Sequence, residues 1–206
     1  GLALSLRPWR GVGRDGPPGL WLAWLLAMAV FWSADRLAAM PITQPLSGAC
    51  LLMLMMGWPL AMLALLPVAG ISGVGAKTLL PVAALAALGT DLGSAELLRR
   101  LVWLGIVPAT LALLMGAALR RWMAHHLFVY ILGRGFFATA VAGALAGALS
   151  AWLHGVPDSL RLDDVMLVRG LAAWGDAFLC GMIVAILVAF RPHWLATYAD
   201  RIYLPK

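Results

Sequence analysis

Residues 165–190 read VMLVRGLAAWGDAFLCGMIVAILVAF, a run in which only Arg169 and Asp176 are charged. A helix of about 20 mostly apolar residues is long enough to cross the hydrocarbon core of a bilayer. This run exceeds that length, so we expect a membrane-spanning helix over these residues. Similar runs recur along the chain, and together they decide the fold class.

The composition of the 206-residue chain favours the same class. Hydrophobic residues make up 63% of it and charged residues 12%, whereas a typical soluble domain has about 25% charged residues. One core of this size cannot hide so much apolar surface, which excludes a soluble globular enzyme. The two cysteines, Cys50 and Cys180, are too few for a disulfide-stapled secreted domain. We therefore expect an all-α integral membrane protein.

Six apolar runs predict a polytopic bundle of six transmembrane helices, or seven if a segment ahead of Gly1 has been removed. The predicted helices cover residues 18–33 (extending toward 39), 46–68, 75–92, 101–119, 127–153 and 165–190. The chain is then a single membrane domain over 1–206, with a lead-in at 1–17, the bundle at 18–190 and a tail at 191–206. Three prolines within the runs are candidate kinks: Pro59, Pro81 and Pro108.

The basic residues predict how the bundle is oriented. With the amino terminus in the cytoplasm, the cytoplasmic side has nine of them: Arg7, Arg10, Arg14, Lys77, Arg120, Arg121, Arg191, Arg201 and Lys206. The opposite side has four: Arg36, Arg99, Arg100 and Arg161. Because cytoplasmic loops are enriched in lysine and arginine, both termini are expected inside. The same bias explains the net charge of +6. No basic run alternates with aromatic residues, so no nucleic-acid partner is expected.

The tail at 191–206 has a different pattern. Trp194, Tyr198 and Ile202 recur at helical spacing after Pro192, and proline suits the first turn of a helix. Trp and Tyr favour the headgroup layer of a bilayer. The tail is therefore predicted to be a short interfacial helix on the cytoplasmic face. The chain has no ATP-binding loop, so uphill transport would need an ion gradient or a partner subunit.

Small residues recur every fourth position in the last two predicted spans. The span at 127–153 has Gly135, Thr139, Gly143, Gly147 and Ala151, and the span at 165–190 has Ala173, Ala177, Gly181 and Ala185. Such stripes let helix backbones approach closely in lipid. They predict tight packing, either between helices of one chain or in a homo-oligomer formed through the same faces.

Ionisable groups at membrane depth are costly, so each of them needs a reason. Asp176 lies near the middle of its predicted helix, and Arg169 and Cys180 share its face at spacings of seven and four. Arg134, in the preceding helix, is long enough to point toward Asp176. One interpretation is a structural ion pair that holds the last two helices together. The other is a carboxylate that binds a substrate or carries a proton, with the two arginines setting its protonation.

Four further residues are candidate metal ligands. His125 and His126 are adjacent in a predicted cytoplasmic loop, and Cys50 and Met53 lie in the span at 46–68. Sulfur ligands suit Cu(I), whereas imidazole and carboxylate suit Ni, Co or Zn. No pair has a diagnostic spacing, and the histidines equally fit interfacial polar residues, as the methionine fits core packing. Cys50 and Cys180 are predicted at different depths, so no disulfide between them is expected.

Intramembrane hydrolysis is the enzymatic interpretation that the sequence offers. Residues 46–49, LSGA, place a serine before a glycine. A serine nucleophile needs a base such as histidine within hydrogen-bond reach, and all four histidines fall in predicted loops or in the tail. We expect no catalytic residue and no enzymatic activity. No cofactor is assigned, apart from a transition-metal ion as a candidate substrate.

Three stretches carry a family resemblance. They are GWPLA at 57–61, HLFVYIL at 126–132 leading into GFF at 135–137, and GDAFLCGM at 175–182, followed by FRPHWL at 190–195 and YL at 203–204. On these motifs the chain resembles a bacterial inner-membrane family labelled energy-coupling-factor transporter permeases. That family is similar to the cobalt- and nickel-capturing components of the same transporter class. The resemblance covers the span at 46–68 and most of the chain from Glu96 onward.

The resemblance implies a substrate-binding membrane subunit that works with a separate ATPase in the bacterial inner membrane. Together with the buried acid, it predicts capture of a small cationic solute, with a transition-metal ion as the first candidate. Asp176 would supply charge and Cys180 a soft ligand, while His125 and His126 would face the cytoplasmic exit or a coupling partner. The alternative is a non-transporting structural subunit or assembly factor of a larger membrane complex.

Overall fold

The computed structural model describes residues 2–6, 19–38, 45–79, 94–123, 126–156, 160–199 and 203, with only the backbone for residues 2, 34–38, 74–79 and 94. Within these ranges the regular structure is helical and there is no β-strand. The prediction of an all-α helical bundle is confirmed. Predictions that depend on the Lys77 side chain, Pro81, His125 or the basic residues near the two termini lie outside what is described.

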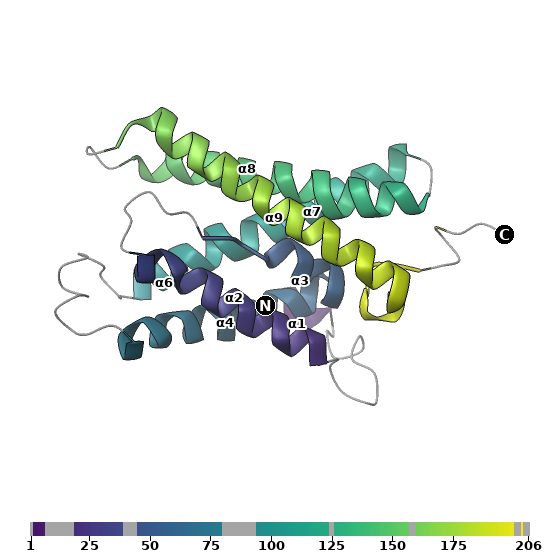
Figure 1. Cartoon of the computed structure of the whole chain (residues 1–206), viewed down its shortest axis with the longest axis horizontal. Helices are drawn as coiled ribbons and strands as arrows, with labels where there is room; N and C mark the ends of the chain where they lie inside the picture. Colours follow the sequence, from purple (N-terminus) through teal and green to yellow (C-terminus); the bar gives the residue numbers. More distant parts are fainter. Residues whose placement is uncertain are drawn as a thin grey trace.

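The helices follow one another along the chain with two π-helical segments among them (Figure 1). The elements are α1 (Leu2–Ser5), α2 (Gly19–Ala38), α3 (Ala49–Met56), α4 (Trp58–Leu79), α6 (Ser94–Arg100), η2 (Leu101–Ile106), α7 (Val107–Trp122), η3 (Val129–Phe137), α8 (Ala138–His154), α9 (Leu162–Phe190) and η4 (Pro192–Trp194). Segments η2 and η3 are π-helical and run directly into α7 and α8, whereas η4 is a single 3₁₀ turn.

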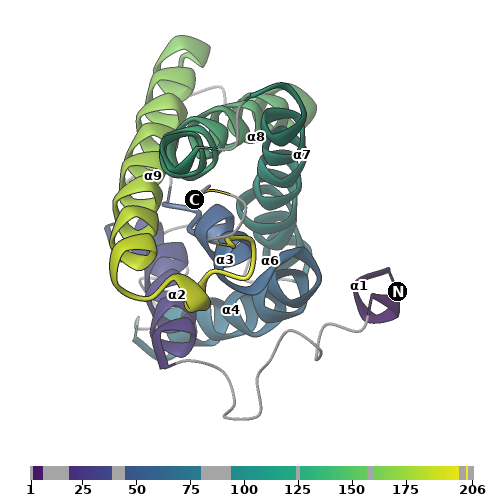
Figure 2. The ribbon, with the colours of Figure 1, turned by 90° about the vertical axis from the view of Figure 1, so that its right-hand side faces the viewer.

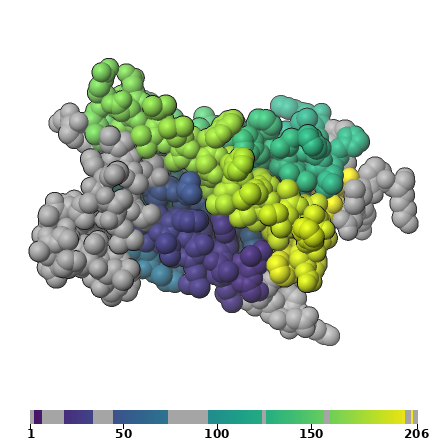
Figure 3. All heavy atoms as spheres, viewed as in Figure 1, coloured from purple at the N-terminus to yellow at the C-terminus, as the bar shows by residue number. Residues whose placement is uncertain are grey.

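Three helices are long and apolar enough to span a membrane: Ala95–Trp122, Val129–His154 and Leu162–Phe190. Helix α9 lies at the surface of the face drawn in Figure 3, beside α2. Its outer side exposes Leu167, Leu171, Trp174 and Phe178, each by more than half. An exposed apolar row of this length is a liability in water and is normal against lipid. These features indicate a membrane protein.

Helix α3 is the centre of the bundle. All eight of its residues are buried, at 7% exposure or less. Seen from the end of the molecule, α3 lies inside a ring formed by α2, α4, α7, α8 and α9 (Figure 2). Its length is about 12 Å at 1.5 Å per residue, well short of a bilayer's hydrocarbon core. It is therefore a half-helix enclosed by protein.

The predicted single helix over 46–68 is wrong, because the chain breaks at Gly57. Gly57 has φ 78° and ψ 157°, a backbone conformation that favours glycine and ends α3. The next helix, α4, begins at Trp58, so Pro59 lies in its first turn, where a missing N–H costs nothing. Pro59 starts a helix and does not kink one. Helix α4 then runs to Leu79, through the start of the span predicted at 75–92.

A second glycine sets the start of α3. Gly48 has φ 64° and leads from the extended residues 45–47 into the helix. Two tryptophans of α2 bind this lead-in through their indole N–H groups. Trp32 Nε1 donates to the Ser47 carbonyl at 2.9 Å, and Trp24 Nε1 donates to the Gly48 carbonyl at 3.1 Å. The first bond satisfies a carbonyl outside regular structure, and the second adds to the bond that the Gly48 carbonyl already accepts from the Leu52 amide of α3.

The tail departs from the predicted interfacial helix. In its described part Pro192–Trp194 and Tyr203 are helical, and after Trp194 the chain turns inward to the carboxyl end of α3. The Ala196 amide donates to the Met55 carbonyl at 3.0 Å, and the Thr197 amide and hydroxyl both donate to the Leu54 carbonyl, at 3.4 and 3.0 Å. The last carbonyls of a helix have no partner within it. The tail therefore caps the buried end of α3.

The two stripes of small residues meet each other within the chain. A Cβ atom built on Gly143 would lie 3.0 Å from the Cβ of Ala173, and one built on Gly135 would lie 3.4 Å from the Cα of Gly181. The backbones of α8 and η3 thus approach α9 as closely as small residues permit. Of the two interpretations of the stripes, internal packing is the one seen in the chain. A homo-oligomer stays a prediction.

Replacing Gly48 by alanine is expected to destabilise the protein by about 1–3 kcal/mol, because a side chain at positive φ is strained and crowded. The new Cβ would lie 2.8 Å from Met28 Cγ and 3.1 Å from Trp24 Cζ2. Gly70→Ala is the matched control, since Gly70 is exposed within α4 and has nothing within 4 Å of its built Cβ. Thermal unfolding in detergent measures both, and equal stabilities would contradict the assignment.

Thr197→Val is expected to cost about 1–3 kcal/mol of stability by removing the hydroxyl that caps Leu54. The same oxygen lies 2.8 Å from the Tyr130 hydroxyl, which must donate because the Thr197 proton goes to the carbonyl. Thr197→Ser keeps both bonds and should cost less than about 1 kcal/mol. If valine and serine at this position gave the same unfolding temperature, the tail would not act as a cap.

Candidate functional site

Asp176 lies at the amino end of α3. Its Oδ1 accepts a hydrogen bond from the Gly48 amide at 2.9 Å, and the residue is 4% exposed. Asp176 belongs to α9 and is 128 positions away from Gly48 in the sequence. The first amides of a helix have no partner within it, and the aligned peptide dipoles favour a negative charge at that end. The predicted buried acid is thus the counter-charge of a buried half-helix.

A small cavity opens beside the carboxylate. It has a volume of about 30 Å³ and is lined by Asp176, Arg169, Ser47, Trp103 and Gly147, among others. A cavity needs roughly 10–15 Å³ to hold one water molecule. The space therefore admits about two waters, or a small ion with part of its hydration. Asp176 and Ser47 provide its oxygen atoms on the α3 side.

Arg169 shares this cavity but bonds elsewhere. Its Nη1 donates to the Gly147 carbonyl in α8, and Gly147 leaves room for the arginine stem, since a Cβ there would lie 3.2 Å from the Arg169 Cβ. Among the described residues, no ion pair joins Asp176 to any arginine. The arginine thus ties α9 to the backbone of α8, while the carboxylate faces the cavity.

Arg134 lies at the other end of α3. Its guanidinium stands over the ring of Tyr130, with Cζ 5.4 Å from the ring centroid, and Nη1 donates to the Thr197 carbonyl at 3.5 Å. Thr197 in turn caps the carboxyl end of α3. Arg134 therefore does not point toward Asp176, because the half-helix separates them by about 9 Å of rise between Gly48 and Leu54.

The two cysteines lie near the carboxylate. The Cys50 thiol donates to the Pro108 carbonyl at 3.6 Å, and the Thr139 hydroxyl donates to Cys180 Sγ at 3.5 Å, one turn of α9 from Asp176. That Cys50 and Cys180 lie at different depths in a membrane stays a prediction. Both are free, buried thiols. Neither thiol is among the described residues that line the cavity.

The predicted metal ligands do not form a cluster in the described part of the chain. No group of three His, Cys, Asp or Glu side chains there is arranged to hold a metal ion. Met53 is buried inside α3 and His126 is exposed just before the helix that continues into η3. His125 is outside the described residues. Of the predicted ion-binding and metal-binding residues, Asp176 and Arg169 line the cavity, whereas Cys50 and Cys180 do not.

Ser47 is a structural residue of the site that sequence reasoning considered only as a nucleophile. Its hydroxyl donates to the Leu104 carbonyl at 2.5 Å and accepts from the Ala49 amide at 3.2 Å. Pro108 has no N–H, so it cannot bond the Leu104 carbonyl four residues earlier. The serine supplies a donor in its place. In the sequence, the available signal is Pro108 itself, because a proline inside a helix leaves the carbonyl four residues earlier in need of another donor.

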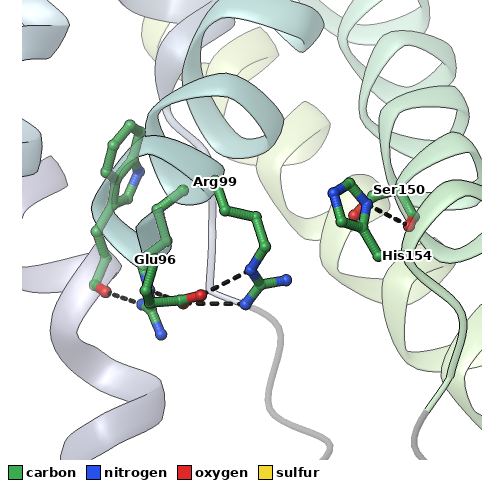
Figure 4. Close-up of polar contacts among 6 residues, drawn as sticks. Glu96, Arg99, Ser150 and His154 are labelled. Atoms are coloured by element: carbon green, nitrogen blue, oxygen red, sulfur yellow. Dashed lines mark hydrogen bonds and ion pairs between the residues drawn. The ribbon is translucent and has the colours of Figure 1, made fainter. Parts of the chain in front are cut away.

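An ionic cluster in α6 also went unpredicted. Glu96 accepts hydrogen bonds from Arg99 at 2.7 Å and from Arg100 at 2.8 Å, and the buried Arg100 donates to the Trp32 carbonyl at 2.7 Å (Figure 4). The figure also shows the His154 ring bonded to the Ser150 carbonyl. The spacing of Glu96 to Arg99 and Arg100, three and four residues, was the signal for the cluster. It fastens α6 to α2 beside the lead-in to α3.

Ser47→Ala is expected to lower the free energy of unfolding by about 1–3 kcal/mol, because it leaves a buried carbonyl and a buried amide without their partner. Ser33→Ala is the control, since Ser33 is equally buried at 9% but bonds only carbonyls of its own helix. Its loss should stay within about 0.5 kcal/mol. Chemical unfolding monitored by tryptophan fluorescence compares the two, and a larger effect at Ser33 would refute the role of Ser47.

No protein-family model matches the chain, and neither a curated protein nor a solved structure is similar to it. The resemblance to energy-coupling-factor permeases stays a prediction, and the function is argued from the site.

Proposed function

We propose that the chain is a multi-pass subunit of a transporter in the bacterial inner membrane, and that it captures a small cationic solute at Asp176. The observation that carries the proposal is a carboxylate buried at the centre of the bundle, facing a cavity and bonded to the Gly48 amide instead of an arginine. Buried ionisable groups in membrane proteins mark ion and substrate pathways.

The charge balance around Asp176 supports a cationic guest. The amino end of a helix is equivalent to roughly +0.5 elementary charge, which compensates part of the carboxylate's charge. Arg169 is engaged with the Gly147 carbonyl. A proton or a small cation would supply the remaining compensation, and the guest would be held by charge without being fixed in a permanent ion pair.

The shape of the site supports transport as well. Many transporters bind their substrate near the middle of the bilayer, where interrupted helices end inside the protein. Helix α3 is interrupted at both ends by glycines at positive φ and is enclosed by longer helices. Its amino end and the cavity meet at Asp176. The site thus lies at the end of an interrupted helix, and the cation would be held by the Asp176 carboxylate, since the amino end of a helix itself favours anions.

The cavity limits the guest to a single small ion. Oxygen atoms of Asp176 and Ser47 would contact it first. A transition-metal ion, the first candidate from the sequence, would also recruit the thiols of Cys50 and Cys180, and their side chains would need to turn toward the cavity. Three further parts of the proposal come from the sequence alone. They are a separate energising partner, the cytoplasmic position of both termini and the inner-membrane location.

A structural subunit is the second candidate function. The observation in its favour is that α3 is capped at both ends, by Asp176 and by the tail, as a permanent part of the fold would be. In that case Asp176 only neutralises the helix end. The two candidates differ in whether the charge of the carboxylate is needed for binding an ion.

Asp176→Asn separates the two functions. Asparagine has nearly the same shape and keeps an oxygen that can accept from the Gly48 amide, so the fold should persist. For the transport function, we expect the affinity for Co²⁺ or Na⁺, measured by equilibrium dialysis on the purified chain, to fall by about tenfold or more, since a charge-assisted contact is lost. Asp164→Asn, an exposed position in the first turn of the same helix, should leave it unchanged.

The structural alternative gives a different result. The unmodified chain would then bind neither ion in dialysis, and Asp176→Asn would change only the unfolding temperature. Co-purification of a stoichiometric membrane partner without metal, checked by elemental analysis, would strengthen that alternative.

A further inference from the structure

Arg134 is a buried cation whose hydrogen bonds are incomplete. The residue is 2% exposed, and its Nε and Nη2 atoms have no hydrogen-bond partner. The guanidinium lies against Gly116 of α7, where a Cβ atom would come within 2.6 Å of Nε. The glycine makes the space that the guanidinium occupies. The guanidinium of Arg134, which extends from η3, thus packs directly against the backbone of α7.

The contacts that Arg134 does make leave its charge unbalanced. A guanidinium has five N–H donors and no acceptor, and here one nitrogen reaches the Thr197 carbonyl at 3.5 Å, the long limit of a hydrogen bond. The ring of Tyr130 adds a cation–π contact. No described acidic side chain forms an ion pair with Arg134. A buried guanidinium without a counter-charge is unfavourable, so an anion is the missing partner.

A small pocket lies beside the guanidinium, between the end of α7 and η3. It has a volume of about 10 Å³ and is lined by Leu119, Arg120, Met123, Tyr130, Arg134 and Tyr203, among others. That space fits roughly one oxygen atom of the size found in water. Among the described residues, the lining includes two arginines and two tyrosines and no carboxylate. Its chemistry selects an anion.

We propose that this pocket is an oxyanion site that takes one oxygen of a phosphate group. The oxygen would accept from the Arg134 guanidinium, and the exposed Arg120 at the rim would contact the remaining oxygens. Parallel bonds to two guanidinium nitrogens are the favoured geometry for phosphate on arginine. A water molecule could accept hydrogen bonds from the Arg134 N–H groups but would not neutralise the positive charge of the guanidinium. The site lies at the opposite end of α3 from Asp176 and does not depend on the proposed transport function.

The phosphate has two possible sources. The pocket is next to Met123, just beyond the last residue of α7, where the exposed Trp122 marks the end of an apolar span. Tryptophan favours the headgroup layer of a bilayer, so a lipid phosphate would lie at this height. Inorganic phosphate offers the same oxygens without the acyl chains.

The experiment uses the full chain in an uncharged detergent and two probes, inorganic phosphate and short-chain phosphatidylglycerol. Binding is measured by the change in intrinsic tryptophan fluorescence, and the unfolding temperature is recorded with and without each probe. The test variant is Arg120→Gln and the matched control is Arg121→Gln. Both arginines are exposed at the end of α7, but only Arg120 lines the pocket. Either change removes one positive charge.

We expect the unmodified chain to bind at least one probe and to unfold at a higher temperature with it. Arg120→Gln should weaken binding by about tenfold, and Arg121→Gln by less than about twofold. Arg134→Gln should abolish the shift in unfolding temperature; because this core variant can fail to fold, Arg120→Gln remains the decisive one. Binding of phosphatidylglycerol alone assigns the site to a lipid headgroup, and binding of both probes assigns it to phosphate in general.

Two results would overturn the proposal. One is that neither probe binds the unmodified chain, which would mean that water alone completes the bonds of Arg134. The other is equal weakening by Arg120→Gln and Arg121→Gln, which would mean that the probes respond only to the net charge at the end of α7.

Discussion

A helix that lies wholly inside a protein must have its end groups satisfied by the protein. Helix α3 places four amide and four carbonyl groups without internal partners in the interior of an apolar bundle. An unpaired buried amide or carbonyl costs about 1–3 kcal/mol. The residues around α3 are therefore constrained more by hydrogen bonding than by packing. Much of the architecture follows from this requirement.

The partners of α3 come from distant parts of the chain. Asp176 of α9 binds the Gly48 amide that leads into the helix, and the Ser47 hydroxyl binds the Ala49 amide in its first turn. The tail, which follows α9 along the chain, binds the carbonyls of Leu54 and Met55. The two glycines that bracket α3 turn the chain so that these partners can reach it. The half-helix and its caps thus specify one arrangement of α9 and the tail.

The two charged groups follow the polarity of α3. An acid stands at its amino end and a base lies beyond its carboxyl end, which is the order that the helix dipole favours. Neither group neutralises the other, because the helix lies between them. In the two proposals, each keeps its charge available for a guest, a cation at Asp176 and an anion at Arg134. Changing the register of α3 would alter both sites together, and this makes the half-helix the physical link between the two proposals.

The sequence predicts features that depend on side-chain hydropathy better than features that depend on backbone hydrogen bonds. The span at 165–190 follows from hydropathy. The burial of Asp176 follows from its position near the middle of that span, and the cost of burying a charge marks it as a residue that needs a partner. The break at Gly57 cannot be predicted in this way, because hydropathy is continuous from 46 to 68. A glycine two residues before a proline fits a kinked helix as well as the end of a helix. The partner of Asp176 is a backbone amide, which has no side-chain signature. Trp24 and Trp32 share one face of α2, but a row of aromatic residues at helical spacing fits lipid contact equally well. What the sequence leaves open is thus the pairing of backbone groups, and in this fold the pairing determines where the charges lie.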